Sequence, residues 1–423
     1  MKIETELYNI IHADAFASAF AGMSGGHVRS FYRGMTGFYD TAEAVKDHPH
    51  RWKKPGLYGL ISQLALLASY AGAARTVGKT EMADLLQTVL GTPEERVQTI
   101  RGNDPCVSEF LMLDRTSGDA VYLHPGCSPL VLCSLYSRML APKKPSDEQI
   151  IRFVTLFTRN SDTVAGALFW DRLVRHQVFA RPDAAFLDAA AAADSLCENM
   201  QSILPLCFSN GIHPDGVEQA AMHIQAVVSC YTDSGLGPHA EKSHIAYVDS
   251  LMHSPVTRVT IDHPLILPFY AIVLALDERY NSGSLPGSAV VSGGETGLAA
   301  ALACQLLPDG VALAESYPFL ADDLVNKKQI QKIVPRIASG RCTMDEMTLF
   351  FDGEQKLSGK EREERAVLMK HARKKAPVRR KKDTRRDREE QLSKHVVESW
   401  TKRDKARWKR EQRRNTGEDD GPV

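Results

Sequence analysis

The sequence predicts a mainly α-helical protein, with a helical globular body and a basic C-terminal tail that is partly disordered or an extended helix. Apolar residues recur at helical spacing through most of the first 352 positions, and 43% of the chain is hydrophobic, enough for a sizeable core. Beyond that point the composition shifts to Lys, Arg and Glu, which cannot build a core of their own. We therefore expect an N-terminal helical region at 1–145, a helical domain at 146–352 and a charged tail at 353–423.

The N-terminal region is predicted to contain helices over residues 1–80, interrupted by a glycine-rich turn at 24–26 and a proline at 49. Residues 55–74 carry no charge over roughly the length of a membrane span, but their glycines and polar residues favour a buried core helix. Membrane association remains an open alternative. Residues 119–136 mix β-forming residues with turn residues, which predicts a short strand pair.

The second region, 146–352, is predicted to begin with a capping box in which Ser146 and Gln149 open a helix. Asp183 is expected to cap one alanine-rich helix that continues to Leu204 with regular apolar spacing. Three more helices are predicted at 217–231, 265–280 and 297–307.

The net charge of zero hides two unlike parts. The tail, 353–423, holds 24 Lys and Arg against 14 Asp and Glu, a net charge of +10. Subtraction from the chain totals of 52 and 52 leaves 28 basic and 38 acidic residues in positions 1–352, a net charge of −10. Such asymmetry indicates that the two parts meet different partners.

Within the tail, residues 365–414 contain 21 basic and 7 acidic residues in dense blocks. Such blocks attract polyanions by counterion release, and interleaved tryptophans can stack on bases. We predict that this tail set binds nucleic acid or an acidic partner; the alternatives are docking on a partner helix or anionic membrane, and a solvated charged helix. The tail set is Arg373, Lys374, Lys375, Arg379, Arg380, Lys381, Lys382, Arg385, Arg386, Trp400, Lys402, Arg403, Trp408, Lys409, Arg410, Arg413 and Arg414.

A relaxed phosphate-binding-loop pattern ends in Gly78, Lys79 and Thr80, and an apolar run ending at Asp277 is a candidate magnesium-holding partner. A true loop of this kind follows a buried strand, whereas the residues before it are rich in Leu and Ala and poor in β-branched residues. The pattern therefore supports a nucleotide hydrolase only as a minor alternative.

No other motif predicts catalysis, and we expect neither a metal nor a cofactor. No His-Glu-x-x-His, Gly-x-Ser-x-Gly or Cys/His zinc spacing occurs in the chain. The eight cysteines include no Cys-x-x-Cys pair, which is typical of buried thiols in a reducing compartment. The N-terminal segment lacks the charged and apolar regions of a secretory signal, so a cytoplasmic protein is expected.

Residues 247–324 carry a spaced pattern of single residues. It comprises Tyr247, Leu251, Pro255, Val256, Val259, His263, Leu274, Leu276, Arg279, Gly283, Leu285, Glu295, Leu298, Leu302, Glu315 and Phe319. This order of residues resembles the C-terminal cytosolic domain of the DotM/IcmP/TrbA proteins, subunits of the coupling complex in type IVB secretion and related conjugation machines.

The resemblance implies a non-enzymatic adaptor beside a coupling ATPase and other secretion or conjugation subunits, at the cytoplasmic face of the inner membrane. The tail would then contact transferred DNA, acidic cargo signals or the ATPase. The alternative is a nucleic-acid-packaging protein, such as a viral nucleoprotein or coat, whose tail neutralises RNA.

Overall fold

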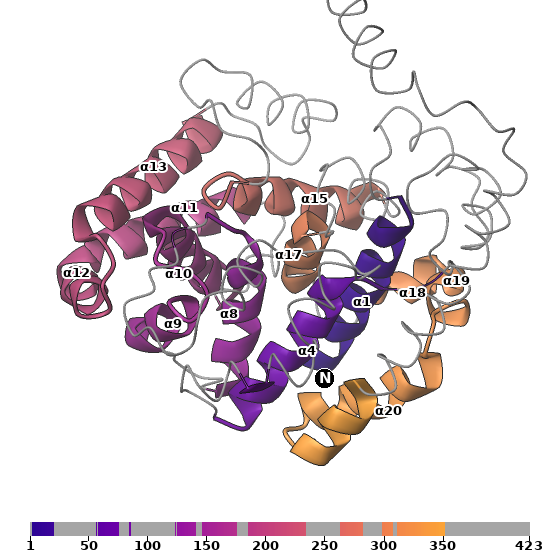
Figure 1. Cartoon of the computed structure of the whole chain (residues 1–423). Helices are drawn as coiled ribbons and strands as arrows, with labels where there is room; N and C mark the ends of the chain where they lie inside the picture. The colour runs from indigo at the N-terminus through magenta and orange to yellow at the C-terminus, as the bar shows by residue number, and fades with distance from the viewer. Residues whose placement is uncertain are drawn as a thin grey trace, which may run out of the picture. The chain divides into compact units, whose positions relative to one another are not determined.

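The computed structural model describes residues 2–20, 56, 58–75, 84–85, 123, 125–140, 146–175, 185–233, 263–281, 298–307 and 311–351. The chain divides into two units, Met1–Arg362 and Glu363–Val423, and every described residue belongs to the first. Within the described residues all regular elements are helices (Figure 1), which confirms the predicted mainly α fold. The predicted tail lies outside the described residues.

The helices of the first unit have the following bounds: α1 Lys2–Phe20, α4 Leu60–Ala73, α8 Ser128–Leu140, α9 Asp147–Val154, α10 Ser161–Arg175, α11 Ala185–Glu198, α12 Met200–Ser209, α13 Pro214–Asp233, α15 Leu267–Asn281, α17 Leu298–Leu306, α18 Leu313–Ser316, α19 Pro318–Asp322 and α20 Lys327–Ala338. Residues 344–351 are also helical. The helices predicted at 217–231, 265–280 and 297–307 are confirmed as α13, α15 and α17.

Helix α4 is the buried core helix predicted at 55–74. Its residues from Leu60 to Gly72 are buried, because the helix packs against α8 on one side and against α1 and α20 on others. Gly72 lets α4 and α8 approach each other closely, because a Cβ atom at this position would overlap the carbonyl oxygen of Tyr136 in α8. In the part of the chain that the structure describes, no helix combines the length and the apolar character that a membrane span requires.

The prediction of a strand pair at 119–136 is wrong for residues 128–136, which form part of a helix. From Ser128 onward the chain forms α8, with Pro129 in its first turn, where the missing N–H costs nothing. The segment is buried on all sides, and a short continuous apolar run suits a buried helix as well as a buried strand. The periodicity therefore could not separate the two structures.

The capping box at the start of α9 is confirmed. The Gln149 backbone N–H donates to Ser146 Oγ at 3.3 Å, and the Ser146 N–H donates to Gln149 Oε1 at 3.2 Å. The single alanine-rich helix predicted up to Leu204 is instead two helices, α11 and α12. The break falls at Asn199, whose side-chain Nδ2 donates to the Ser195 carbonyl at 2.6 Å alongside its own backbone N–H. Asp183 lies outside the described residues.

One apolar core runs through the described helices and includes residues from Leu7 to Phe351. Helix α8 lies between α4 and α10, α10 packs on α11 and α13, and α17 packs on α15, α1 and α8. Residues of both predicted regions, 1–145 and 146–352, contribute to this core. Helices α1, α8 and α10 contribute residues to this core and also position the polar groups described next.

Candidate functional site

A cluster of charged and polar side chains lies between α1, α8 and α10; four of its members are buried, and Arg175 is half-buried, with 16% of its side chain exposed. We call this the polar cluster, and it consists of Glu6, Ser137, Arg138, Asp171 and Arg175. The exposed fractions of Glu6, Arg138 and Asp171 are 3%, 8% and 1%. Charged side chains are rarely buried, and buried titratable groups tend to gather at functional sites. This cluster is therefore the first candidate for a catalytic site.

The Glu6–Arg138 pair joins α1 to α8 across 132 positions of sequence. Arg138 Nη1 donates to Glu6 Oε2 at 2.7 Å and Nη2 donates to Oε1 at 2.5 Å, a bidentate arrangement. Arg138 Nε donates to the Ser134 carbonyl at 3.1 Å, which holds the guanidinium plane against its own helix. Burial opposes the charge, but Glu6 and Asp171 outweigh it and raise the pKa of Arg138.

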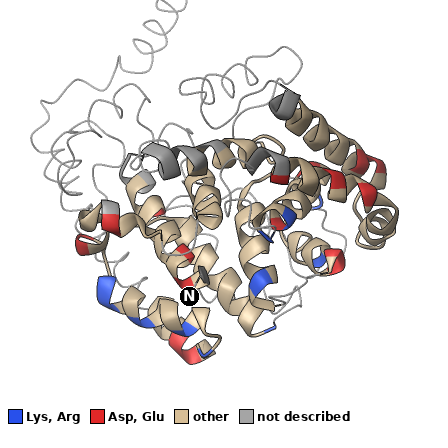
Figure 2. Cartoon of the chain, turned by 180° about the vertical axis from the view of Figure 1, so that it is seen from behind, with Lys and Arg blue, Asp and Glu red and all other residues tan. Residues whose placement is uncertain are grey.

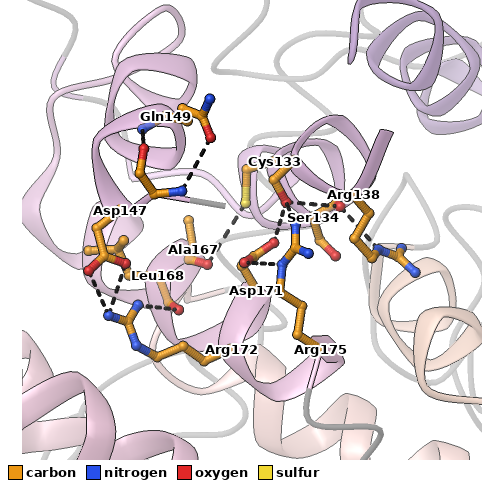
Figure 3. Close-up of polar contacts among 12 residues, drawn as sticks. Cys133, Ser134, Arg138, Asp147, Gln149, Ala167, Leu168, Asp171, Arg172 and Arg175 are labelled. Carbon is orange, nitrogen blue, oxygen red and sulfur yellow. Dashed lines mark hydrogen bonds and ion pairs between the residues drawn. The ribbon is translucent and has the colours of Figure 1, made fainter. Parts of the chain in front are cut away.

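The second half of the polar cluster joins α8 to α10 (Figure 3). Ser137 Oγ donates to Asp171 Oδ1, and Arg175 contacts both groups, through Nε to Asp171 Oδ2 at 2.8 Å and through Nη2 to Ser137 Oγ at 3.0 Å. The partners of the hydroxyl are thus a carboxylate, a guanidinium and the Ser134 carbonyl. A serine nucleophile is usually activated by an adjacent imidazole, and none is among these contacts; the one carboxylate present, Asp171, is itself ion-paired with Arg175.

The polar cluster therefore balances its own charge, with two carboxylates facing two guanidinium groups. Cys133 lies beside it in α8 and donates through Sγ to the Leu130 carbonyl at 3.3 Å and the Ala167 carbonyl at 3.8 Å. Burial, reinforced by Asp171, raises the pKa of this thiol well above its usual range, so the reactive thiolate is disfavoured. The geometry is that of a clamp between helices rather than of a poised nucleophile.

A third buried carboxylate, Asp14 of α1, caps the N-terminus of α4. Its Oδ2 accepts from the Gly59 N–H at 2.8 Å, from the Ser62 N–H at 3.0 Å and from the Ser62 hydroxyl. The N-terminal N–H groups of a helix lack internal partners and carry partial positive charge, which a carboxylate satisfies. Asp14 thereby fixes the orientation of α1 against the core helix.

The predicted nucleotide site is not brought together by the described residues. Gly78, Lys79 and Thr80 lie outside them, and Asp277 lies within α15, a helix rather than the strand that holds such an acid in phosphate-binding folds. The element that ends at Ala73, directly before the loop pattern, is also a helix. Every member of the tail set lies outside the described residues as well.

Sequence reasoning missed three groups of residues that form this site: Glu6 with Arg138, Asp171 with Arg175, and the cap at Asp14. The Asp171–Arg175 pair had a readable signal, an acid and a base at i, i+4 on the same helix. The Glu6–Arg138 pair had none in the local sequence. Among the described residues, no group of three or more His, Cys, Asp or Glu side chains has the arrangement to hold a metal ion.

Charged residues are unevenly distributed along the described helices, although acidic residues also lie beside the basic ones at α20 (Figure 2). Residues 185–233, which form α11 to α13, contain six Asp and Glu and no Lys or Arg. By contrast, residues 327–341, which form α20 and the turn after it, contain five Lys and Arg and no Asp or Glu. The segregation seen between the tail and positions 1–352 thus recurs on a smaller scale within the body.

No model of a known protein family matches the chain, and a search of curated proteins finds no match. The class that the fold and the site define is a mainly helical protein with an internally neutralised polar cluster and an uneven distribution of charge along its helices.

Proposed function

We propose that the chain is a non-catalytic adaptor whose C-terminal tail binds nucleic acid. The single observation that carries this proposal is the distribution of charge, +10 over 353–423 against −10 over the rest of the chain. A segment of this density gains free energy by replacing the counterions of a phosphate backbone, whatever the base sequence. The rest of the chain carries a net negative charge, so the tail is the main binding element.

The described interior supports the adaptor part of the proposal. The charged groups of the polar cluster neutralise one another in ion pairs, and burial favours the neutral form of the Cys133 thiol. Such an interior holds helices in register and presents a rigid surface. It does not resemble the opposed pKa values that acid–base catalysis uses.

The resemblance over 247–324 suggests where such an adaptor works. We infer a subunit of a conjugative DNA-transfer or type IVB secretion coupling complex, at the cytoplasmic face of the inner membrane and beside a coupling ATPase. In that setting the tail receives DNA or an acidic partner and the helical body contacts the other subunits.

The test uses the full chain and a variant in which the tail blocks 379–382 and 385–386 are changed to Gln. A control variant changes the arginines of the same blocks to Lys, which keeps their charge. Binding to fluorescent single- and double-stranded DNA is titrated between 50 and 300 mM salt. The slope of log K against log salt should fall by about 0.9 for each duplex phosphate that the variant no longer neutralises, and the Lys control should keep it. Equal slopes for all three proteins would contradict the proposal.

Assembly state separates the adaptor from the packaging protein. Light scattering should show a species of fixed size with nucleic acid present, whereas shells or filaments would favour packaging. A nucleotide hydrolase would instead show ATP turnover that Lys79→Ala abolishes.

A further inference from the structure

We propose that α20 carries a second nucleic-acid contact, on the body of the protein. It is the exposed basic stripe formed by Lys328 and Lys332 on the helix and by Arg341 just after the turn that ends it. The inference rests on the proposed function, because it assigns a further contact for the same ligand. It differs from that function in placing the contact on a described helix with defined neighbours.

The stripe follows from the amphipathic pattern of α20. Its buried side is formed by Ile330, Ile333, Val334 and Ile337, which pack toward α1 and α4. Lys328 and Lys332 are separated by four positions, so they share the opposite side, and both are exposed. Burial of the four apolar side chains therefore fixes which way the lysines point.

The charges of the stripe are available to a ligand. Two other basic residues of the segment are neutralised locally, since Lys327 Nζ lies 2.9 Å from Asp322 Oδ1 and Arg336 Nε lies 2.8 Å from Glu346 Oε1. Within the described part of the chain, Lys328, Lys332 and Arg341 have no acidic partner in salt-bridge range. Three cations without a described acidic partner stand out on one exposed segment of a body whose net charge is negative.

The chemistry of α20 favours a phosphate backbone over a membrane surface. A helix that lies in a membrane interface inserts its apolar side into the lipid, but the apolar side of α20 is already buried in the core. The outward positions beside the lysines are the exposed amides Gln329 and Gln331, which suit sugar and phosphate oxygens. Cβ atoms at i, i+4 lie about 6 Å apart, within side-chain reach of successive phosphates on one strand.

Covalent continuity strengthens the pairing of the stripe with the tail. Arg341 precedes Arg365, where the dense basic stretch begins, by 24 positions. A strand held by one element is therefore kept at high effective concentration for the other, and the two contacts reinforce each other without any new interaction.

The experiment compares four full-length proteins in the DNA titration: the wild type, Lys328→Gln/Lys332→Gln, the tail variant, and the matched control Gln201→Glu/Gln219→Glu. The control changes net charge by the same two units at exposed positions on α12 and α13. Removal of two phosphate contacts should lower the salt slope for duplex DNA by about 1.8, whereas the control, which adds only long-range repulsion, should change the slope much less. Circular dichroism verifies that each variant is folded.

The outcomes distinguish the stripe from the tail. If the lysine variant keeps the wild-type slope while the tail variant loses it, the proposed DNA contact at the basic stripe is overturned and the proposed DNA binding by the tail stands. An equal loss in the control would assign the effect to net charge and overturn the stripe. If the wild type binds no DNA, both proposals fail. Vesicles of phosphatidylserine and phosphatidylcholine serve as the other probe, and lysine-dependent binding to them with unchanged DNA binding would also overturn the inference.

Discussion

Removal of Glu6 should be among the most damaging single changes in the described body. Glu6→Ala leaves the Arg138 guanidinium buried, with 8% of the residue exposed and its bidentate partner gone. A buried charge without its counter-charge costs about 3–5 kcal/mol, which is a large part of the roughly 5–15 kcal/mol that stabilises a typical domain. Replacement of both partners, as Glu6→Leu/Arg138→Met, removes the charge as well as the acceptor.

We therefore expect the double variant to be more stable than Glu6→Ala and within about 1–2 kcal/mol of the wild type. The chain offers a matched control in the Glu148–Arg152 pair, whose side chains are 44% and 60% exposed. Glu148→Ala should cost no more than about 0.5 kcal/mol, because water screens that pair and takes over its hydrogen bonds. The contrast isolates burial, since both pairs have short N–O distances.

The assay is urea unfolding at pH 7, followed by circular dichroism at 222 nm and by tryptophan fluorescence. Coincident transitions justify a two-state free energy of unfolding, extrapolated to zero urea. A cost below about 1 kcal/mol for Glu6→Ala would refute the reasoning, since it would mean that Arg138 reaches water once Glu6 is gone. A double variant as unstable as the single one would show that the loss comes from packing rather than charge.

Three further predictions use the same assay or thiol labelling. Burial lowers the pKa of His12 in the folded protein to about 4. Between about pH 6.5 and pH 4 the unfolded chain therefore binds a proton at His12 that the folded protein does not bind. The free energy of unfolding should fall as the pH is lowered through this range. By pH 4.5 that loss should reach about 2 kcal/mol, and a His12→Gln variant with the same loss would contradict it. Gly72→Ala should destabilise by about 1–3 kcal/mol despite the better helix former, because its Cβ would overlap the Tyr136 carbonyl; exposed Ala191→Gly measures the opposing propensity, about 1 kcal/mol. Burial raises the pKa of Cys342 to about 11, so iodoacetamide at pH 8 should label it about 100-fold more slowly than free cysteine, and labelling at the free rate would contradict this.

The sequence predicted those parts of the fold that depend on local chemistry. The capping box at Ser146 is an example, because donor and acceptor lie three positions apart and the helix start needs both. The break at Asn199 escaped prediction because the apolar spacing continues across it. At the break the Asn199 side chain donates to the Ser195 carbonyl, which also accepts from the Asn199 backbone N–H, and this local contact leaves the periodicity unchanged.

The polar cluster shows the opposite case. Glu6 lies near the start of the chain and Arg138 lies on a helix mistaken for strands, so no local pattern connects them. Their pairing depends on how α1 and α8 pack, which is a property of the whole core. The basic stripe on α20 was within reach of sequence reasoning, since lysines four apart opposite a set of isoleucines already define two sides of a helix.

The acidic surface of α11 to α13 gives the stripe a testable counterpart. Glu198 and Glu218 are exposed there, on a segment without a single Lys or Arg, and should repel a polyanion before it reaches the protein. Repulsion of this kind acts over the Debye length, about 30 Å at 10 mM salt but about 8 Å at 150 mM. Glu198→Gln/Glu218→Gln should therefore raise the association rate for duplex DNA at 10 mM salt in stopped-flow measurements, with little effect at 150 mM. An equal gain in association rate at both salt concentrations would indicate that these carboxylates contact the DNA directly. The basic stripe on α20 would then not be the only DNA contact on the described body.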